Sequence, residues 1–365
     1  MFSIDDHKHM SRALELARRG WYTAHPNPRV GCVIVKDGDV VGEGFHAVAG
    51  EAHAEVRALE VAGEKARGAT AYVTLEPCSH HGRTPPCADA LVHAGIARIV
   101  AAMTDPNPRV AGQGLDRLRA EDVQVEEGLL GFAARELNFG FIQRMTEGRP
   151  RVRVKLAASL DGRTAMASGE SKWITGDAAR ADVQRLRAES SGIVTGIGTV
   201  LADDPGLDVR LPEMSRQPER IVLDPRLRTP VNAKMLSLPG TTRIFTCSND
   251  SKRRAALESA GAVVEIVQDD DANALLLEAV LARLGELEHN DVLVEAGATL
   301  AGQFLARGLA DEMIVYQAPV LLGHEARPLV TLPGLEKLSD RLELKLRDVR
   351  QIGDDLRLTL VRKLG

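Results

Sequence analysis

Cysteine and aromatic residues are scarce in this sequence. Of 365 residues, 3% are aromatic and four are cysteines. So few cysteines exclude a disulfide-stabilised secreted scaffold and are typical of a reducing compartment. No apolar run approaches about 20 residues, the length that a membrane-spanning helix needs. The start of the chain, MFSIDDHKHM, lacks a basic region followed by an apolar one, so we expect no signal peptide and a cytoplasmic location.

The sequence also lacks an excess of positive charge. It carries 46 Lys and Arg against 51 Asp and Glu, a formal net charge of −5. Proteins that bind polynucleotides concentrate Lys and Arg, so nucleic acid is not an expected partner. The length allows two domains, each large enough for its own core.

The most informative stretch runs from His53 to Cys87. His53, Cys78 and Cys87 offer one imidazole and two thiolates, a ligand set that suits Zn²⁺. Three protein ligands leave the fourth position open for water, as in catalytic zinc sites, and such water ionises near pH ~7. Glu55 is close enough in sequence to transfer the protons of that water. The pattern therefore predicts a zinc hydrolase with one zinc per chain.

The spacing of the cysteines departs from the zinc-deaminase signature, H-x-E followed by P-C-x-x-C. Eight residues separate Cys78 from Cys87, so residues 79–86 form an additional loop across the mouth of the site. Contact of its His80 and His81 with substrate stays open. A redox pair of cysteines is the competing interpretation, but it is usually spaced C-x-x-C and leaves the upstream His-x-Glu unexplained.

Strands and helices alternate in the first half and predict a three-layer α/β domain over residues 1–146. The expected elements are a helix capped by Asp5 or Asp6 and ending near Arg19, a hairpin around Asp37-Gly38, a helix over 52–62 with His53 in its first turn, a strand over 70–75, a helix that begins at Cys87 and ends before Gly95, and a strand over 98–103.

Three other residues of this half could have a functional role. Cys32 lies in a strand and is expected to be a buried apolar residue. His46 is expected to be a surface loop residue. Asn27, in the HPNP turn, is equally compatible with turn chemistry and with a base-binding amide.

After a polar linker over 145–151, a second domain is expected over 151–365, without metal-type residues. Predicted strands are 151–159, 192–196, 220–224, 262–267, 291–295 and 313–318; predicted helices are 177–189, 251–260, 272–284 and 299–307. The alternating runs LELKL and LRLTL predict an antiparallel hairpin at a sheet edge.

The second domain carries phosphate-binding signals. In VEAGATLAG (294–302), a buried strand is followed by Gly297 and a helix start, which is anion-binding geometry. Gly196-Ile197-Gly198 lacks the third glycine of the dinucleotide fingerprint and is weak evidence. Arg187 and Arg210 either hold a second phosphate or are solvated, and Asp203 is either functional or a turn former. This half is expected to bind a phosphorylated ligand.

Long motifs in both halves resemble one known family. HPNPRVGCVIVKDG, HAEVRAL, TAYVTLEPCSHHGRTPPC, DPNPRVAGQG, KLAASLDGRTA, SKWIT, VLADDP and VEAGATLAG are similar to the bifunctional deaminase–reductases of riboflavin biosynthesis. The resemblance implies a cytidine-deaminase-like N-terminal domain and a C-terminal domain like dihydrofolate reductase. It also accounts for the eight-residue spacing of the cysteines. The implied substrate is 2,5-diamino-6-ribosylamino-4(3H)-pyrimidinone 5′-phosphate, which is deaminated and whose ribosyl group NADPH then reduces to ribityl.

The resemblance also implies residue roles. His53, Cys78 and Cys87 would bind zinc, Glu55 would transfer protons, and Lys155 would polarise the centre that is reduced. The implied NADPH-binding residues are Ala157, Trp173, Thr199, Asp203, Gly297, Ala298, Thr299, Leu300, Ala301, Gly302 and Gln303. The implied substrate-binding residues are Ser171, Arg187, Leu207, Arg210 and Glu295.

Two other functions compete with this one. A nucleoside or tRNA zinc deaminase with an accessory phosphate-binding domain would keep the zinc motif, but it would not need the second half. A structural zinc module would require a fourth Cys or His ligand and would leave Glu55 without a role. We further expect a homo-oligomer, either a dimer or a tetramer, and no membrane partner.

Overall fold

The computed structural model describes residues 1–365 except 80–85, 109, 213, 215, 268–274 and 364–365. The chain divides into two compact units, Met1–Gly148 and Arg149–Gly365. Helix α6 (Phe139–Glu147) occupies the first part of the predicted linker, and strand β6 begins at Arg151, so only residues 148–150 lie between these elements. No helix among the described residues is both long and apolar enough to cross a membrane.

A five-stranded sheet forms the centre of the N-terminal unit, in the order β2-β1-β3-β4-β5. Its strands are β1 (Gly31–Lys36), β2 (Asp39–Phe45), β3 (Thr70–Val73), β4 (Arg98–Ala101) and β5 (Gln124–Glu127). β1 and β2 form the predicted hairpin, β1 is also antiparallel to β3, and β3, β4 and β5 are parallel. The carboxyl ends of β3 and β4 therefore lie at one edge of the sheet.

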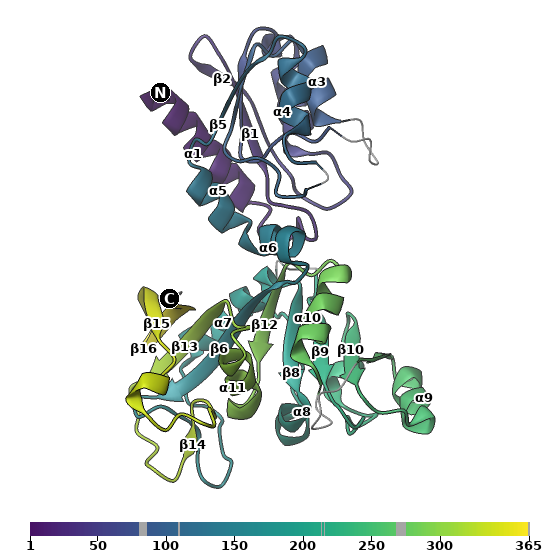
Figure 1. The fold of residues 1–365 in the computed structure, drawn as a ribbon, viewed down its shortest axis with the longest axis vertical. Helices are drawn as coiled ribbons and strands as arrows, with labels where there is room; N and C mark the ends of the chain where they lie inside the picture. The colour runs from purple at the N-terminus through teal and green to yellow at the C-terminus, as the bar shows by residue number, and fades with distance from the viewer. Residues whose placement is uncertain (80–85, 109, 213, 215, 268–274, 364–365) are drawn as a thin grey trace. The chain divides into compact units, whose positions relative to one another are not determined.

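Helices cover both faces of this sheet (Figure 1), which confirms the three-layer arrangement. Helices α1 (Ile4–Arg18) and α5 (Gly131–Leu137) lie on one face; α2 (Ala54–Ala62), α3 (Cys87–His93) and α4 (Gln113–Arg119) lie on the other. Glycines allow close packing: a Cβ at Gly31 would lie 2.0 Å from the carbonyl oxygen of Ala13, and one at Gly44 would lie 2.3 Å from that of Ala54. Neither position has room for a side chain.

The starts of α1 and α2 differ from the prediction. Ser3, rather than Asp5 or Asp6, caps α1: its hydroxyl accepts from the Asp6 amide, and the Asp6 carboxylate accepts from the Ser3 amide. Asp6 itself is buried, where it also accepts from Tyr72 and Arg98. Helix α2 begins at Ala54, and His53 is its extended N-cap residue. A capping box of Ser3 and Asp6 thus begins α1, whereas the extended backbone of His53 precedes α2 without a side-chain cap.

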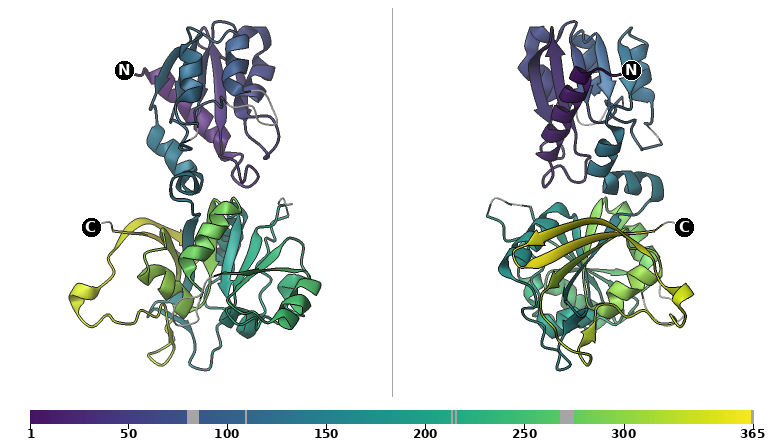
Figure 2. Two further views of the ribbon diagram at one scale, coloured as in Figure 1. Left: turned by 45° about the vertical axis from the view of Figure 1, so that its right-hand side comes forward. Right: turned by 90° about the vertical axis from the view of Figure 1, so that its left-hand side faces the viewer.

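A nine-stranded sheet forms the C-terminal unit, in the order β11-β10-β9-β8-β12-β6-β13-β16-β15. Seven strands are parallel: β6 (Arg151–Ser159), β8 (Gly192–Gly196), β9 (Glu219–Leu223), β10 (Thr242–Thr246), β11 (Ala262–Ile266), β12 (Asp291–Glu295) and β13 (Glu312–Ala318). Strands β15 (Leu344–Ile352) and β16 (Asp355–Arg362) form the predicted antiparallel hairpin at one edge, drawn in yellow in Figure 2. A separate pair joins β7 (Arg163–Ala165) and β14 (Arg327–Pro328).

Apolar side chains lie on both faces of this sheet. One cluster joins strand residues such as Val154 with α10 (Leu277–Glu286) and α11 (Ala298–Ala306). A second joins Ile314 with α7 (Asp177–Glu189), and a third lies between α8 (Ile197–Asp203), α9 (Ser251–Ser259) and the strands beside them. Strand β10 and helix α8 were not predicted. The predicted helix 272–284 begins at Leu277, and its first three residues lie outside the described part of the chain.

Candidate functional sites

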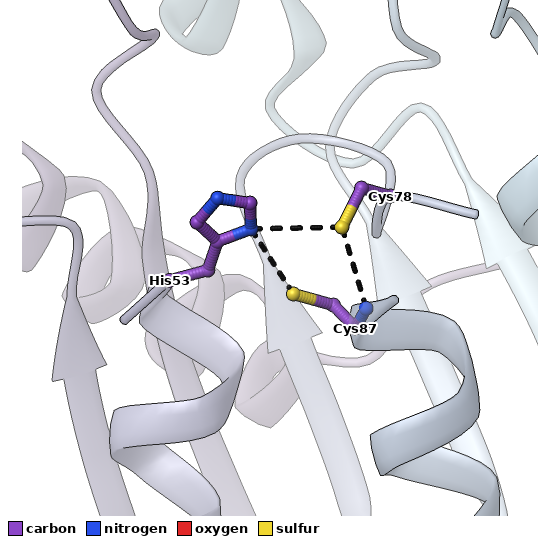
Figure 3. A group of neighbouring side chains, drawn as sticks. All are labelled: His53, Cys78 and Cys87. Atoms are coloured by element: carbon purple, nitrogen blue, oxygen red, sulfur yellow. Dashed lines mark hydrogen bonds between the residues drawn. The ribbon is translucent and has the colours of Figure 1, made fainter. Parts of the chain in front are cut away.

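Three predicted zinc ligands converge in the N-terminal unit (Figure 3). The ligand atoms of His53, Cys78 and Cys87 all lie within 4.8 Å of one another. Nδ1 of His53 is 3.2 Å from Sγ of Cys87 and 3.6 Å from Sγ of Cys78. His53 caps α2, Cys78 follows β3, and Cys87 opens α3, so three separate elements supply one donor each. Convergence of this kind is typical of a metal site.

The two sulfurs have opposed proton affinities. Hydrogen bonds from the Cys87 side chain and from His53 lower the pKa of Cys78 to about 4, and the Cys87 backbone amide also donates to that sulfur at 3.3 Å. The hydrogen bond to Cys78 and burial raise the pKa of Cys87 far above its usual range. One thiolate therefore suppresses ionisation of the other, and a bound divalent cation would relieve this conflict. The donor set fits zinc.

Glu55 lies in the first turn of α2, two residues after His53, and its side chain is buried. Burial raises the pKa of Glu55 to about 7, and the nearby Cys78 charge adds to the increase. The N-cap position of His53 explains how two residues of different helix faces approach one site. A carboxyl group with a pKa near neutrality can both take and return a proton.

Asn27 and His46 lie beside the cluster of His53, Cys78 and Cys87. The sequence interpretation missed this arrangement. His46 is 2% exposed, so its assignment as a surface residue was wrong. The Asn27 amide donates to Nε2 of His46 at 3.0 Å, and the His46 ring stands edge-on to that of His53 with 5.3 Å between centroids. Gly31 at the start of β1 pairs with Phe45 at the end of β2. The hairpin therefore brings the segment before Gly31 close to the segment after Phe45. That register was the available signal.

Glu76 is a further residue that sequence reasoning missed. Its carboxylate is buried and accepts from three backbone amides, those of Asp105 and Gly112 at 2.9 Å each and that of Gly114 at 2.7 Å. Glu76 thereby ties the DPNP loop to the segment that carries Cys78. His80 and His81, whose contact with substrate was left open, lie outside the described residues.

A charged cluster occupies the C-terminal unit. Lys155 on β6 is the direct cross-strand neighbour of Glu295 on β12. Arg187 of α7 donates from Nε and Nη2 to the two oxygens of Glu295, at 2.6 and 3.0 Å. Among the described residues, no hydrogen bond from the Lys155 ammonium is found, and its Nζ lies 6.0 Å from the centroid of the Tyr316 ring. Lys155 therefore keeps its donors for another group.

Burial and mutual charge set the proton affinities of this cluster. Burial lowers the pKa of Lys155, and the Arg187 charge lowers it further, against an opposing effect of Glu295. Burial by itself would raise the pKa of Glu295, but Arg187 and Lys155 outweigh it and lower the pKa. At neutral pH this arrangement keeps a carboxylate ionised beside a lysine that releases its proton more readily than usual.

The predicted NADPH-binding loop begins at the N-cap of α11. Gly297 is exposed, and a Cβ built there meets no atom within 4 Å. Ala301 and Gly302 instead face the interior: Ala301 is fully buried, and a Cβ at Gly302 would lie 2.0 Å from the carbonyl oxygen of Thr331. The loop thus offers its first turn to a ligand, whereas these two residues pack the helix. The other members of the predicted set lie along the same helix: Ala298, Thr299, Leu300 and Gln303.

The remaining predicted cofactor residues lie on one strand, one helix and one loop. Ala157 is near the carboxyl end of β6. Thr199 and Asp203 belong to α8, so Asp203 ends a helix rather than forming a turn. Trp173 is 71% exposed, with the Arg180 guanidinium 4.7 Å from its ring centroid. An ion pair of 3.9 Å between Lys172 and Asp203 brings the segment of Trp173, which also contains Ser171, beside α8.

The segment after α8 contacts the charged cluster. The Asp208 carbonyl accepts from Nη1 of Arg187 at 3.0 Å, and the Arg210 amide donates to Gln184 of the same helix at 2.9 Å. The Arg210 side chain is exposed, whereas the Leu207 side chain is packed in the core. Of the predicted substrate residues, Arg187, Arg210 and Glu295 are therefore near one another, and Leu207 can meet a ligand only through its backbone.

Comparisons with known proteins agree with this division. Residues 3–103 match the family model described as the cytidine and deoxycytidylate deaminase zinc-binding region, and residues 150–358 match the RibD C-terminal domain. The fold and the site thus define a zinc-deaminase-like unit joined to a dihydrofolate-reductase-like reductase unit. The chain belongs to the RibD family, the bifunctional deaminase–reductases of riboflavin biosynthesis.

Relatives match over nearly the whole chain. The riboflavin biosynthesis protein RibD of Escherichia coli (strain K12) is 54% identical over 98% of this chain and 100% of its own length. The structure of Acinetobacter baumannii RibD has a TM-score of 0.92 at 49% identity and covers 99% of each chain. A Thermotoga maritima structure, described as a diaminohydroxyphosphoribosylaminopyrimidine deaminase/5-amino-6-(5-phosphoribosylamino)uracil reductase, has a TM-score of 0.86 at 34% identity over 98% of this chain and 99% of that one. The deaminase and reductase activities expected from the sequence are confirmed.

Proposed function

We propose that the N-terminal unit removes the 2-amino group of 2,5-diamino-6-ribosylamino-4(3H)-pyrimidinone 5′-phosphate as ammonia. The observation that carries this proposal is the convergence of His53, Cys78 and Cys87 beside the buried Glu55. Zinc held by these three donors would supply a water that ionises near pH ~7. Glu55 would accept a proton from that water and donate one to the departing amino group. The raised pKa of Glu55 suits both transfers.

The C-terminal unit would then reduce the ribosyl group of the deaminated product to ribityl, with NADPH as the hydride donor. Lys155 would donate to the sugar oxygen on which negative charge develops, because its ammonium has no other hydrogen-bond acceptor among the described residues and its pKa is lowered. Arg187 holds Glu295 in place, and the exposed Arg210 would contact the substrate phosphate. The first turn of α11, from Gly297, would face the cofactor pyrophosphate.

A nucleoside or tRNA deaminase with an accessory phosphate-binding domain is not favoured. The match to the reductase domain over residues 150–358 gives the second half an activity of its own. A phosphate site needs only positive charge and hydrogen-bond donors, whereas the cluster of Lys155, Arg187 and Glu295 also contains a carboxylate.

The experiment that tests both activities uses paired assays on one protein. Ammonia release is measured with the 2,5-diamino substrate. The absorbance loss of NADPH is measured with the product of its deamination. Lys155→Ala should retain ammonia release while NADPH oxidation falls, since the lysine acts only in the reduction. Lys345→Ala, an exposed lysine on β15, is the matched control and should change neither rate. If Lys155→Ala left NADPH oxidation unchanged in folded protein, the assigned role of Lys155 would be wrong.

A further inference from the structure

A fully buried tyrosine, Tyr316 of β13, lies beside the charged cluster of the C-terminal unit. The parallel register pairs Ile314 with Lys155 and Tyr316 with Ala157. Alternate residues of a strand share a face, so Tyr316 lies on the same face of the sheet as Lys155, one step further along β13. Nζ of Lys155 stands over the Tyr316 ring at 6.0 Å from its centroid, close to the outer limit of a cation–π contact.

The ring is anchored through its hydroxyl group. The Tyr316 hydroxyl donates to Oδ2 of Asp182 at 2.5 Å, and Nη1 of Arg357 donates to the same oxygen at 2.9 Å. Asp182 is a buried residue of α7, and Arg357 of β16 is the direct cross-strand neighbour of Tyr316. A helix and a neighbouring strand therefore fix the far end of the ring, which has little freedom to turn away from Lys155.

Helix α7 supports two different neighbours of the Lys155 side chain. Asp182 and Arg187 are five residues apart, or about 7.5 Å along the helix axis at 1.5 Å per residue. Asp182 holds the Tyr316 hydroxyl, whereas Arg187 holds the carboxylate of Glu295. The surroundings of Lys155 are therefore set by one helix that contacts the strands on either side of β6.

An aromatic ring has a particular effect in this position. It attracts an ammonium group through its electron-rich face, whereas a free carboxylate would form a salt bridge and occupy an N–H donor. The ring thus partly offsets the burial that lowers the pKa of Lys155, and the N–H donors stay available. Burial and the hydrogen bond to Asp182 raise the pKa of Tyr316 far above its usual range, so the phenol itself stays neutral.

We propose that Tyr316 is a positioning residue of the reduction, whose anchored ring keeps the Lys155 ammonium charged and limits the directions in which it can turn. This proposal rests on the proposed function, because the position of Lys155 matters only if Lys155 donates to the sugar oxygen. Among the described residues, the charged and titratable groups that border Lys155 come from three elements: Glu295 from β12, Arg187 from α7 and Tyr316 from β13.

The test follows NADPH oxidation by the full chain as a function of pH, with the product of deamination as substrate. A lysine that acts in its charged form makes the rate fall as the pH rises through the lysine pKa. Tyr316→Leu removes the ring and destabilises the charged form, so the fall should move to lower pH by about 0.4–0.7 units. In the same variant kcat should decrease about threefold to tenfold, while KM for NADPH stays within about twofold.

Three other variants separate the ring from the stability of the core. Tyr316→Phe keeps the ring and should leave the pH of the fall within about 0.2 units of wild type. Tyr316→Met is a second ring-free variant, whose flexible side chain fills irregular space, and it carries the same prediction if Tyr316→Leu does not fold. Val183→Ala is the matched control, since Val183 is buried in the same apolar cluster on α7; it should lower the melting temperature without moving the fall.

A second measurement needs no substrate. Reductive methylation modifies only neutral lysine, so its extent at Lys155, followed by mass spectrometry against pH, reports the charge of that side chain directly. Lys155 should react at lower pH in Tyr316→Leu than in wild type, by the same shift as in the rate profile. Equal labelling profiles in wild type and the ring-free variants would overturn the inference, as would a shift in Tyr316→Phe as large as that in Tyr316→Leu.

The Lys155→Ala variant separates this inference from the proposed function. If Lys155→Ala oxidised NADPH at the wild-type rate, the proposed role of Lys155 would fail, and the role of Tyr316 with it. If Lys155→Ala were inactive while the folded ring-free variants kept the wild-type kcat and pH profile, only the inference about Tyr316 would be wrong.

Discussion

Replacement of Glu55 by glutamine tests the deaminase site most directly. Glutamine has the shape of glutamate but cannot accept and return a proton. The Glu55 side chain is buried in the first turn of α2, beside the three predicted zinc donors. We therefore expect Glu55→Gln to keep the fold and the metal while it loses catalysis.

The structure sets the size of both effects. General acid–base help is worth roughly 10²–10⁴ in rate, or about 2.7–5.4 kcal/mol at 1.36 kcal/mol per decade. The cost in stability should be about 1 kcal/mol or less, because burial already raises the pKa of Glu55 to about 7 in the metal-free protein. A carboxyl group that is only about half ionised at pH 7 loses less charge than a fully ionised one when an amide replaces it.

The assay is the initial rate of ammonia release at saturating substrate, with zinc content determined by elemental analysis and folding checked by thermal unfolding. Glu60→Gln is the matched control, since Glu60 is exposed on the same helix, and it should release ammonia at the wild-type rate. A zinc-loaded, folded Glu55→Gln protein with a rate within twofold of wild type would refute the role of Glu55. The proton transfers would then need another residue.

Two further predictions concern cofactor binding and acid stability. Gly297→Val should fold normally, because a Cβ there meets nothing within 4 Å, yet it should raise the dissociation constant for NADPH. Gly302→Ala should instead lower the melting temperature, because its Cβ would lie 2.0 Å from the Thr331 carbonyl oxygen. Equal NADPH affinity in Gly297→Val and wild type would place the cofactor elsewhere. The hydrogen bond from Arg98 and those from Ser3 and Tyr72 lower the pKa of Asp6 in the folded protein. The ionised Asp6 carboxylate therefore stabilises the fold fully above the unfolded-state pKa of about 3.9, and this stabilisation is lost as the pH falls toward the lower folded-state pKa. Asp6→Asn should lower the free energy of unfolding of the N-terminal unit by about 1–3 kcal/mol at pH 7, with a smaller difference from wild type at pH 2.5 in urea unfolding; an equal difference at both pH values would contradict this.

Local patterns were sufficient for most elements of the fold. Strand β6 and helix α7 have the bounds that periodicity predicts, 151–159 and 177–189. Both carry long regular patterns of apolar residues, which are the strongest signal in a sequence. Helix α8 was missed because its seven residues, IGTVLAD, follow a glycine N-cap, contain a second glycine and have no capping side chain. Strand β10 was missed because its five residues follow a turn-rich stretch without an alternating pattern.

Within the deaminase site, the metal-type residues were predictable from the sequence, but the side chains that surround them were not. The residue types and spacing of His53, Cys78 and Cys87 pointed to one cluster, and the structure brings their donor atoms together. The burial of His46 was not predictable, because it depends on β2 returning antiparallel along β1 and carrying that residue back beside Asn27. The hairpin itself was predicted, but its register and the burial at its base cannot be read from the residues around His46.

The charged cluster of the C-terminal unit shows what the sheet adds to the sequence. Lys155 and Glu295 are 140 positions apart, yet the parallel pairing of β6 with β12 makes them direct neighbours. An isolated pair would form a salt bridge and neutralise both charges. Arg187 prevents this, because it occupies both oxygens of Glu295 through its forked donors. The lysine therefore remains half-buried, next to a carboxylate that is already engaged, and its pKa is lowered. Under the proposed function, Arg187 would keep Glu295 engaged and so leave the Lys155 ammonium free for the sugar oxygen of the substrate.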